Sequence, residues 1–200
     1  MILPESLTTL TIYHDVTEAH VELMLLQCPK LESLAFIFSP PDEFRRGNRP
    51  LASVRPRRIL RDGEILVYDS LRKLRVKVRR TPDRNMLARF VFPSLEIVEY
   101  GEYYAPEPLG TKWLTAHTSF HQIKRLTLDI WSTTAIADVL GAAPNIEELL
   151  IQTAHPSALS SLLPTRAGAS QHSAILPSLR RLHITGCLLY TSLSGLARQT

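Results

Sequence analysis

The chain has 200 residues and a formal net charge of +4 at pH 7, which allows one domain or one run of stacked repeats. Its hydrophobic fraction of 44% and charged fraction of 21% are ordinary for a folded protein, so the composition excludes a fully disordered chain. The longest apolar stretches fall far short of the ~20 residues that a membrane-spanning helix needs, so we expect no contact with a membrane.

One pattern, apolar-x-x-apolar-x-apolar, recurs seven times along the chain and predicts seven short strands. The first residues of these segments are 24, 40, 24, 28, 23 and 33 positions apart. A pattern that returns in this way is typical of stacked repeats. The seven segments are Leu7–Ile12, Leu31–Phe36, Leu71–Val76, Leu95–Tyr100, Ile123–Leu128, Ile146–Ile151 and Leu179–Ile184.

Between the strands, the apolar spacing changes to that of a helix. Thr17 is a predicted N-cap, with His20 at the third helical position. A single apolar stripe follows, made of Val21, Met24, Leu25 and Cys28. The same spacing predicts further helices over residues 134–141 and 157–163 and at the C-terminal end. Four strands are entered through Pro-x-apolar, where proline ends a helix and favours an extended neighbour; these prolines are Pro29, Pro93, Pro144 and Pro177.

We therefore predict an α/β fold, a right-handed solenoid of about seven strand-helix repeats that occupies residues 1–200 as a single domain. Its parallel strands line a concave face, and its helices lie outside. The two long gaps require insertions, at about residues 39–65 and 164–175. The first insertion is charged and rich in proline, which favours disorder. It belongs to the basic segment 42–89, which has 15 Arg and Lys against 6 Asp and Glu.

The last repeat, from Leu179 to Leu189, reads L-R-R-L-H-I-T-G-C-L-L and resembles the leucine-rich-repeat signature L-x-x-L-x-L-x-x-[N/C]-x-L. The other repeats lack Asn or Cys at the ninth position. Irregular repeats with Pro-x-Leu-x-x-Leu entries are similar to the substrate-recognition half of F-box/leucine-rich-repeat proteins. This resemblance implies a protein-binding adaptor of a cullin-type ubiquitin ligase. Because no F-box helices precede the first repeat, we expect an F-box upstream in a longer gene product, or its loss, and we interpret the chain as a fragment.

Side chains alternate between the two faces of a strand, which predicts a surface for a partner. If Leu74 and Val76 point into the core, then Lys73, Arg75 and Lys77 point to the concave face. These cations suit an acidic or phosphorylated segment of a protein partner; the alternative is a solvated face whose charges keep the chain soluble. The predicted partner-binding residues are Tyr13, Lys73, Arg75, Lys77, Glu99, Arg125, Asp129, Glu148, Gln152, Arg181 and His183.

The sequence contains no motif that predicts catalysis, a cofactor or a metal site. His117 and His121 have the spacing of one helix face, but no third ligand is suggested nearby. We predict that Cys28 and Cys187 are buried structural residues. The chain is therefore predicted to be a binding module that has no enzyme activity and no cofactor.

Two other functions remain open. One is a leucine-rich-repeat scaffold unrelated to ubiquitin ligases. The other is a nucleic-acid binder that uses the basic segment 42–89, although this segment lacks the interleaved aromatic residues and groove-reading helix of such proteins. With no secretory signal and only two distant cysteines, we expect an intracellular location, cytoplasmic or nuclear. The sequence does not determine the oligomeric state.

Overall fold

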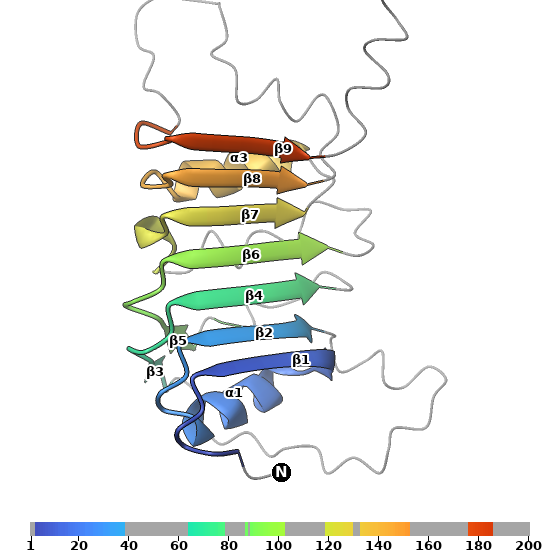
Figure 1. The fold of residues 1–200 in the computed structure, drawn as a ribbon, viewed down its shortest axis with the longest axis vertical. Coiled ribbons are helices and arrows are strands. Elements are labelled where there is room, and N and C mark those ends of the chain that lie inside the picture. Colours follow the sequence, from blue (N-terminus) through green and yellow to red (C-terminus); the bar gives the residue numbers. More distant parts are fainter. Residues whose placement is uncertain are drawn as a thin grey trace, which may run out of the picture.

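Seven strands form one parallel sheet, and they lie side by side in chain order (Figure 1). The computed structural model describes residues 3–38, 64–78, 87, 89–102, 119–129, 133–152 and 176–185. The strands are β1 (Thr9–Val16), β2 (Ser33–Phe38), β4 (Lys73–Val78), β6 (Ile97–Glu102), β7 (Arg125–Asp129), β8 (Glu148–Gln152) and β9 (Arg181–Thr185). Each neighbouring pair is parallel, so the predicted parallel arrangement of the seven repeated segments is confirmed.

A repeated backbone contact sets the register of the sheet. The N–H groups of Glu32 and Ser33 both donate to the carbonyl of Thr8, at 2.8 and 3.0 Å. The same pair of hydrogen bonds recurs at the start of each later strand, where two successive N–H groups donate to one carbonyl of the preceding repeat. The other accepting carbonyls belong to Glu32, Arg72, Glu96, Lys124 and Glu147. We call this row of six carbonyls and the residues that carry them the entry row.

Burial alternates along the strands as the sequence predicts. In β4, Leu74 and Val76 are buried, whereas Arg75 is exposed and Lys73 and Lys77 are half-buried. The strands β2, β7 and β8 repeat this alternation. A parallel sheet covered on both faces has nearly continuous apolar strands, so the alternation indicates that only one face packs against the core.

The elements that cover the apolar face differ from repeat to repeat. Helices α1 (Glu18–Gln27) and α3 (Thr133–Ala142) lie on the same side of the sheet (Figure 1). The approach to β4 and to β6 is instead made by the two-residue strands β3 (Leu66–Val67) and β5 (Phe90–Val91), which pair with each other. A 3-10 turn, η3 (Phe120–Gln122), precedes β7. Within the described ranges, helices therefore precede β2 and β8, and β3, β5 and η3 directly precede β4, β6 and β7.

Two of the predicted helices are present at nearly their predicted positions. In α1, Thr17 is the N-cap and the stripe of Val21, Met24, Leu25 and Cys28 is buried. The Cys28 thiol is free, and its burial raises its pKa, which favours the structural role expected for it. The predicted helices at 157–163 and at the C-terminal end, the insertion at 164–175 and Cys187 lie outside the described residues, as does the insertion at about 39–65 except for residues 64 and 65. Within the described ranges, no helix is long and apolar enough to cross a membrane.

The first strand departs from the regular register. Thr11 pairs with Ala35, but the next pairing joins Asp15 to Ile37, so β1 contains extra residues at this point. Such a bulge inserts residues that have no partner opposite. Tyr13 lies in it and is 80% exposed. The prediction that Tyr13 continues the regular row of outward residues is therefore wrong, because Asp15 takes that place in the register.

The side chain of Tyr68 connects two successive repeats inside the covering layer. Its hydroxyl donates to the carbonyl of Cys28 and accepts the N–H of Leu31 at 3.0 Å. Nearby, the Ser70 hydroxyl donates to the carbonyl of Pro29 at 2.8 Å. Burial is the main cause of a raised pKa at Tyr68, so its hydroxyl remains protonated and able to donate. The turn that leads from α1 into β2 is thus held by residues that precede β4.

We expect Tyr68→Phe to lower the free energy of unfolding by about 0.5–1.5 kcal/mol, because the Cys28 carbonyl loses the hydroxyl donor and the Leu31 N–H keeps only its bond to Cys28. Urea unfolding of the two proteins measures this difference. Tyr13→Phe is the matched control, since the Tyr13 side chain is largely in solvent, and it should change stability by less than ~0.5 kcal/mol. Equal losses in the two variants would contradict the proposed role of Tyr68.

A histidine completes the N-terminal cap of α1. The Nδ1 atom of His20 accepts the backbone N–H of Thr17 at 3.2 Å and lies 2.7 Å from the Thr17 hydroxyl. Burial lowers the pKa of His20 from 6.5, so folding favours the neutral ring. A protonated ring has hydrogen on both nitrogens and cannot accept the Thr17 N–H.

This cap makes stability depend on pH through His20. Because the native pKa is lowered, its contribution is complete above 6.5, the pKa of the unfolded chain, and is lost as the pH falls through the native pKa. We expect His20→Gln, which keeps a side-chain acceptor without a titrating proton, to lose less stability between pH 7.5 and pH 5 than the parent. Urea unfolding at several pH values measures the difference. If the two proteins show parallel pH profiles, His20 does not carry this dependence.

Candidate partner-binding face

The outward side chains of the strands form three rows on the face opposite to α1 and α3, and we call this face the open face. Equivalent residues stand next to one another because each parallel pair is in register. Ten of the eleven predicted partner-binding residues lie on it and are exposed or half-buried. These ten are Lys73, Arg75, Lys77, Glu99, Arg125, Asp129, Glu148, Gln152, Arg181 and His183.

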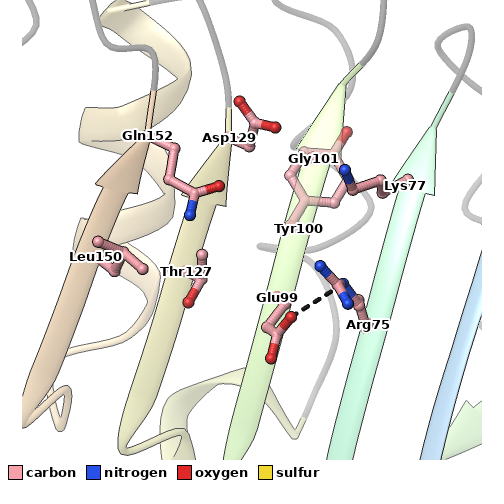
Figure 2. Close-up of a pocket in the computed structure, with 9 residues that line it drawn as sticks. All are labelled: Arg75, Lys77, Glu99, Tyr100, Gly101, Thr127, Asp129, Leu150 and Gln152. Atoms are coloured by element: carbon pink, nitrogen blue, oxygen red, sulfur yellow. Dashed lines mark ion pairs between the residues drawn. The ribbon is translucent and has the colours of Figure 1, made fainter. Parts of the chain in front are cut away.

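Lys73 and Arg75 of β4 form ion pairs with Glu99 of the next strand. Lys73 Nζ lies 2.6 Å from Glu99 Oε1, and Arg75 Nε lies 3.0 Å from Glu99 Oε2, the second pair being drawn in Figure 2. Glu99 therefore offsets part of the positive charge that the sequence predicts for this strand. An acidic partner would have to compete with Glu99 for both cations, which was not evident from β4 alone.

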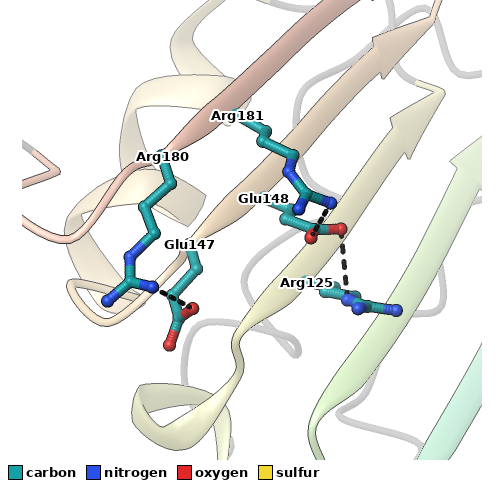
Figure 3. A network of polar contacts seen from close by, with 5 residues as sticks. All are labelled: Arg125, Glu147, Glu148, Arg180 and Arg181. Atoms are coloured by element: carbon teal, nitrogen blue, oxygen red, sulfur yellow. Dashed lines mark hydrogen bonds and ion pairs between the residues drawn. The ribbon is translucent and has the colours of Figure 1, made fainter.

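A second group of ion pairs crosses the last three strands (Figure 3). Glu148 lies between two cations, with Oε2 3.1 Å from Arg125 Nε and Oε1 2.7 Å from Arg181 Nη1. One residue earlier in the chain, Arg180 Nη1 lies 3.9 Å from Glu147 Oε2. Glu147 and Glu148 thus both form ion pairs with arginines of the next repeat.

The entry row carries charges whose sign alternates from strand to strand. The first residue of the row, Thr8, is uncharged. The residues that follow it, together with the equivalent residue of the last repeat, are Glu32, Arg72, Glu96, Lys124, Glu147 and Arg180. Lys124 Nζ, for example, lies 3.2 Å from Glu96 Oε1. Opposite charges facing each other across strands are favourable and like charges are not, so the alternation favours one register. The signal was present in the sequence and becomes visible only when equivalent positions of the repeats are compared.

A shallow hollow of about 150 Å³ lies on the open face, across β4, β6, β7 and β8 (Figure 2). Gly101 lines it, because it has no side chain to fill the space between its neighbours. A Cβ atom at Gly101 would stand 3.3 Å from Asp129 Cβ and 3.6 Å from Lys77 Cγ. Leu150 and Gln152 continue the lining on the far side. The hollow therefore presents a cation, a carboxylate, an amide and an apolar side chain, which together can bind a segment by charge, hydrogen bond and contact.

The two histidines with the spacing of one helix face, His117 and His121, are not both in the described part of the chain. His121 lies in the 3-10 turn η3, and its backbone carbonyl accepts a hydrogen bond from Asn145 Nδ2 at 2.9 Å. His117 lies outside, as do the arginines of the basic segment between residues 42 and 63. Among the residues that can be placed, no three His, Cys, Asp or Glu side chains are grouped as metal ligands.

No family model matches the chain, and neither a curated protein nor a solved structure gives a match.

We expect Glu148→Lys to lower the free energy of unfolding by about 1–2 kcal/mol, because it removes two ion pairs and places three cations in adjacent strands. Urea unfolding at low salt measures the loss. It should shrink in 1 M NaCl, where the Debye length falls to about 3 Å. Glu5→Lys, at an exposed site before the first strand, is the control for the change in net charge. Similar losses in both variants would show that the cross-strand position of Glu148 does not matter.

Proposed function

We propose that the chain is a leucine-rich-repeat solenoid that binds a protein partner on its open face. The seven recurring segments support this, since they stack in chain order as parallel strands with one apolar face against the core. The observation that carries the proposal is the hollow at Gly101, on the face that α1 and α3 leave uncovered (Figures 1 and 2). A groove lined by groups of both charges and by Leu150 suits recognition of a polypeptide.

The partner segment that fits this face best is acidic. Lys73, Arg75 and Lys77 bring three positive charges to one strand, and Glu99 is the acidic residue that pairs with two of them. A carboxylate or phosphate of the partner could take the place of Glu99 on Arg75, since guanidinium groups bind such anions in paired hydrogen bonds. Glu99 then keeps the face from attracting anions indiscriminately when no partner is bound.

By the resemblance to F-box/leucine-rich-repeat proteins, we propose that this recognition serves a ubiquitin-ligase adaptor inside the cell. The resemblance concerns the repeat pattern and its proline entries at Pro29, Pro93, Pro144 and Pro177. The same open face would serve a scaffold equally well, so the identity of the captured proteins distinguishes these two functions.

Gly101→Leu tests the proposed face, because its side chain would fill the hollow between Lys77 and Asp129. We expect affinity capture from cell extract with the variant to recover at least about tenfold less of the protein partner that the parent recovers. Gly141→Leu makes the same change in α3, where a Cβ atom meets nothing within 4 Å, and should capture as the parent does. Thermal unfolding followed by circular dichroism shows that both variants remain folded.

The identity of the captured proteins decides between the two proposed functions. Recovery of a cullin adaptor together with the partner supports the ligase adaptor. A partner recovered without any ligase component supports a scaffold and contradicts the ligase proposal. A partner recovered equally by the parent and Gly101→Leu contradicts the use of this face in either function.

A further inference from the structure

The carbonyl of Arg180, at the outer edge of the sheet, is equivalent to the six carbonyls of the entry row. In each of the six preceding repeats, the equivalent carbonyl accepts two N–H groups from the next strand. The N–H groups of Arg180 and Arg181 themselves donate to Glu147, at 2.8 and 3.0 Å, as this pattern requires. Among the described residues, none donates in the same way to the Arg180 carbonyl, and β9 is the last strand of the sheet. The backbone of β9 can therefore accept one more parallel strand.

The charges at this edge specify what kind of strand fits. The charges of the entry-row side chains alternate in sign, and the last two belong to Glu147 and Arg180. An acidic residue at the equivalent position of an added strand would continue this alternation. The next residue of the added strand should also be acidic. Glu148 lies between Arg125 and Arg181, and a second acidic residue would pair with Arg181 from the opposite side. Both arginine side chains are largely exposed, at 78% for Arg180 and 67% for Arg181.

The core side of β9 is also incomplete. Leu182 and Ile184 are 46% and 39% exposed, whereas Leu149 and Ile151, their register partners in β8, are 1% and 0% exposed. A strand added to β9 with apolar residues at these two positions would cover them. The edge thus combines an available carbonyl, two cations and two apolar side chains in one register.

We propose that the outer edge of β9 binds a strand of a partner protein, in parallel, with the pattern apolar-acidic-acidic-apolar-x-apolar. The two acidic residues pair with Arg180 and Arg181, and the apolar residues that follow cover Leu182 and Ile184. This is β-strand addition, in which the backbone gives affinity and the alternate side chains give specificity. The proposal adds a second binding site to the open face and does not depend on the hollow at Gly101.

Residues 186–200, which follow β9, do not match this pattern. They contain no Asp or Glu. The required pattern occurs once in the sequence, at Ile146–Ile151, and this segment already lies between β7 and β9. A second copy would have to give up the centre of its own sheet to supply it. The pattern does provide a ready probe, because β8 shows how such a strand pairs with Arg180 and Arg181.

The test uses a fluorescent peptide with the sequence of residues 144–153 and the whole chain. We expect saturable binding by fluorescence anisotropy, and at least about tenfold weaker binding of the peptide in which Lys replaces both glutamates, since like charges then face each other. The double variant Arg180→Gln, Arg181→Gln, which places no like charges opposite Glu147 and Glu148, should bind the two peptides about equally. Lys30→Glu, an exposed change in the turn before β2, should leave the preference of the parent unchanged.

Hydrogen exchange locates the peptide and separates this proposal from the one above. Bound peptide should slow exchange in residues 181–185, and Gly101→Leu should bind it as the parent does. The proposal is overturned if both peptides bind the parent equally, or if neither saturates by about 1 mM, where binding is too weak to be specific. It is also overturned if Gly101→Leu abolishes binding or if the protected amides lie outside β9, because the peptide then occupies another surface.

Discussion

The double hydrogen bond at each strand entry is the contact on which the rest of the sheet depends. Two N–H groups of one repeat meet a single carbonyl of the repeat before it, so the start of each strand is placed relative to its neighbour. Because side chains alternate along a strand, this placement also decides which of them face the core. A slip of one residue in β4 would bury Arg75 and expose Leu74 and Val76. The apolar pattern selects this register, the double hydrogen bond holds it at each strand entry, and the open face follows from the two together.

The charged side chains support the same register by a different route. Exposed ion pairs contribute little to stability individually, and the arginines around Glu148 are mostly in solvent. Their alternation in sign nevertheless disfavours every arrangement that brings like charges together. The alternation therefore lets one face carry many cations in neighbouring strands. It also means that the charges of the open face are largely committed to one another, as Glu99 shows for Lys73 and Arg75.

Much of the sheet could be predicted from the sequence because its signal is local and repeated. The apolar pattern gave the seven strands, and the helical stripe after Thr17 gave α1 with its N-cap. The strands β3 and β5 were missed because two residues are too few to show a period. Phe90 and Phe92, whose rings stack at a centroid distance of 6.0 Å, carry an extended pattern where a helix was expected.

The candidate site was predicted less completely than the sheet. The outward positions of β4 and β7 to β9 were recognised, since alternation alone identifies them. The bulge at Tyr13 was not, because a shift of register depends on the partner strand. The partners of Glu99 and Glu148 and the hollow at Gly101 lie between repeats that are 23 to 33 residues apart, and they emerge only when the strands are aligned.

The pairing of β3 with β5 has a consequence for the curvature of the molecule. Strands in the main sheet lie ~4.8 Å apart, whereas helices packed side by side need about 8–10 Å. Where helices cover adjacent repeats, the repeats must therefore lie farther apart in the helical layer than in the sheet. The sheet then curves, with its open face on the concave side. Next to β4 and β6, the described elements β3 and β5 are themselves hydrogen-bonded strands, so here the two layers share one spacing. This pairing favours a straighter stack beneath Arg75 and Glu99, which would admit a broad surface as well as a narrow peptide.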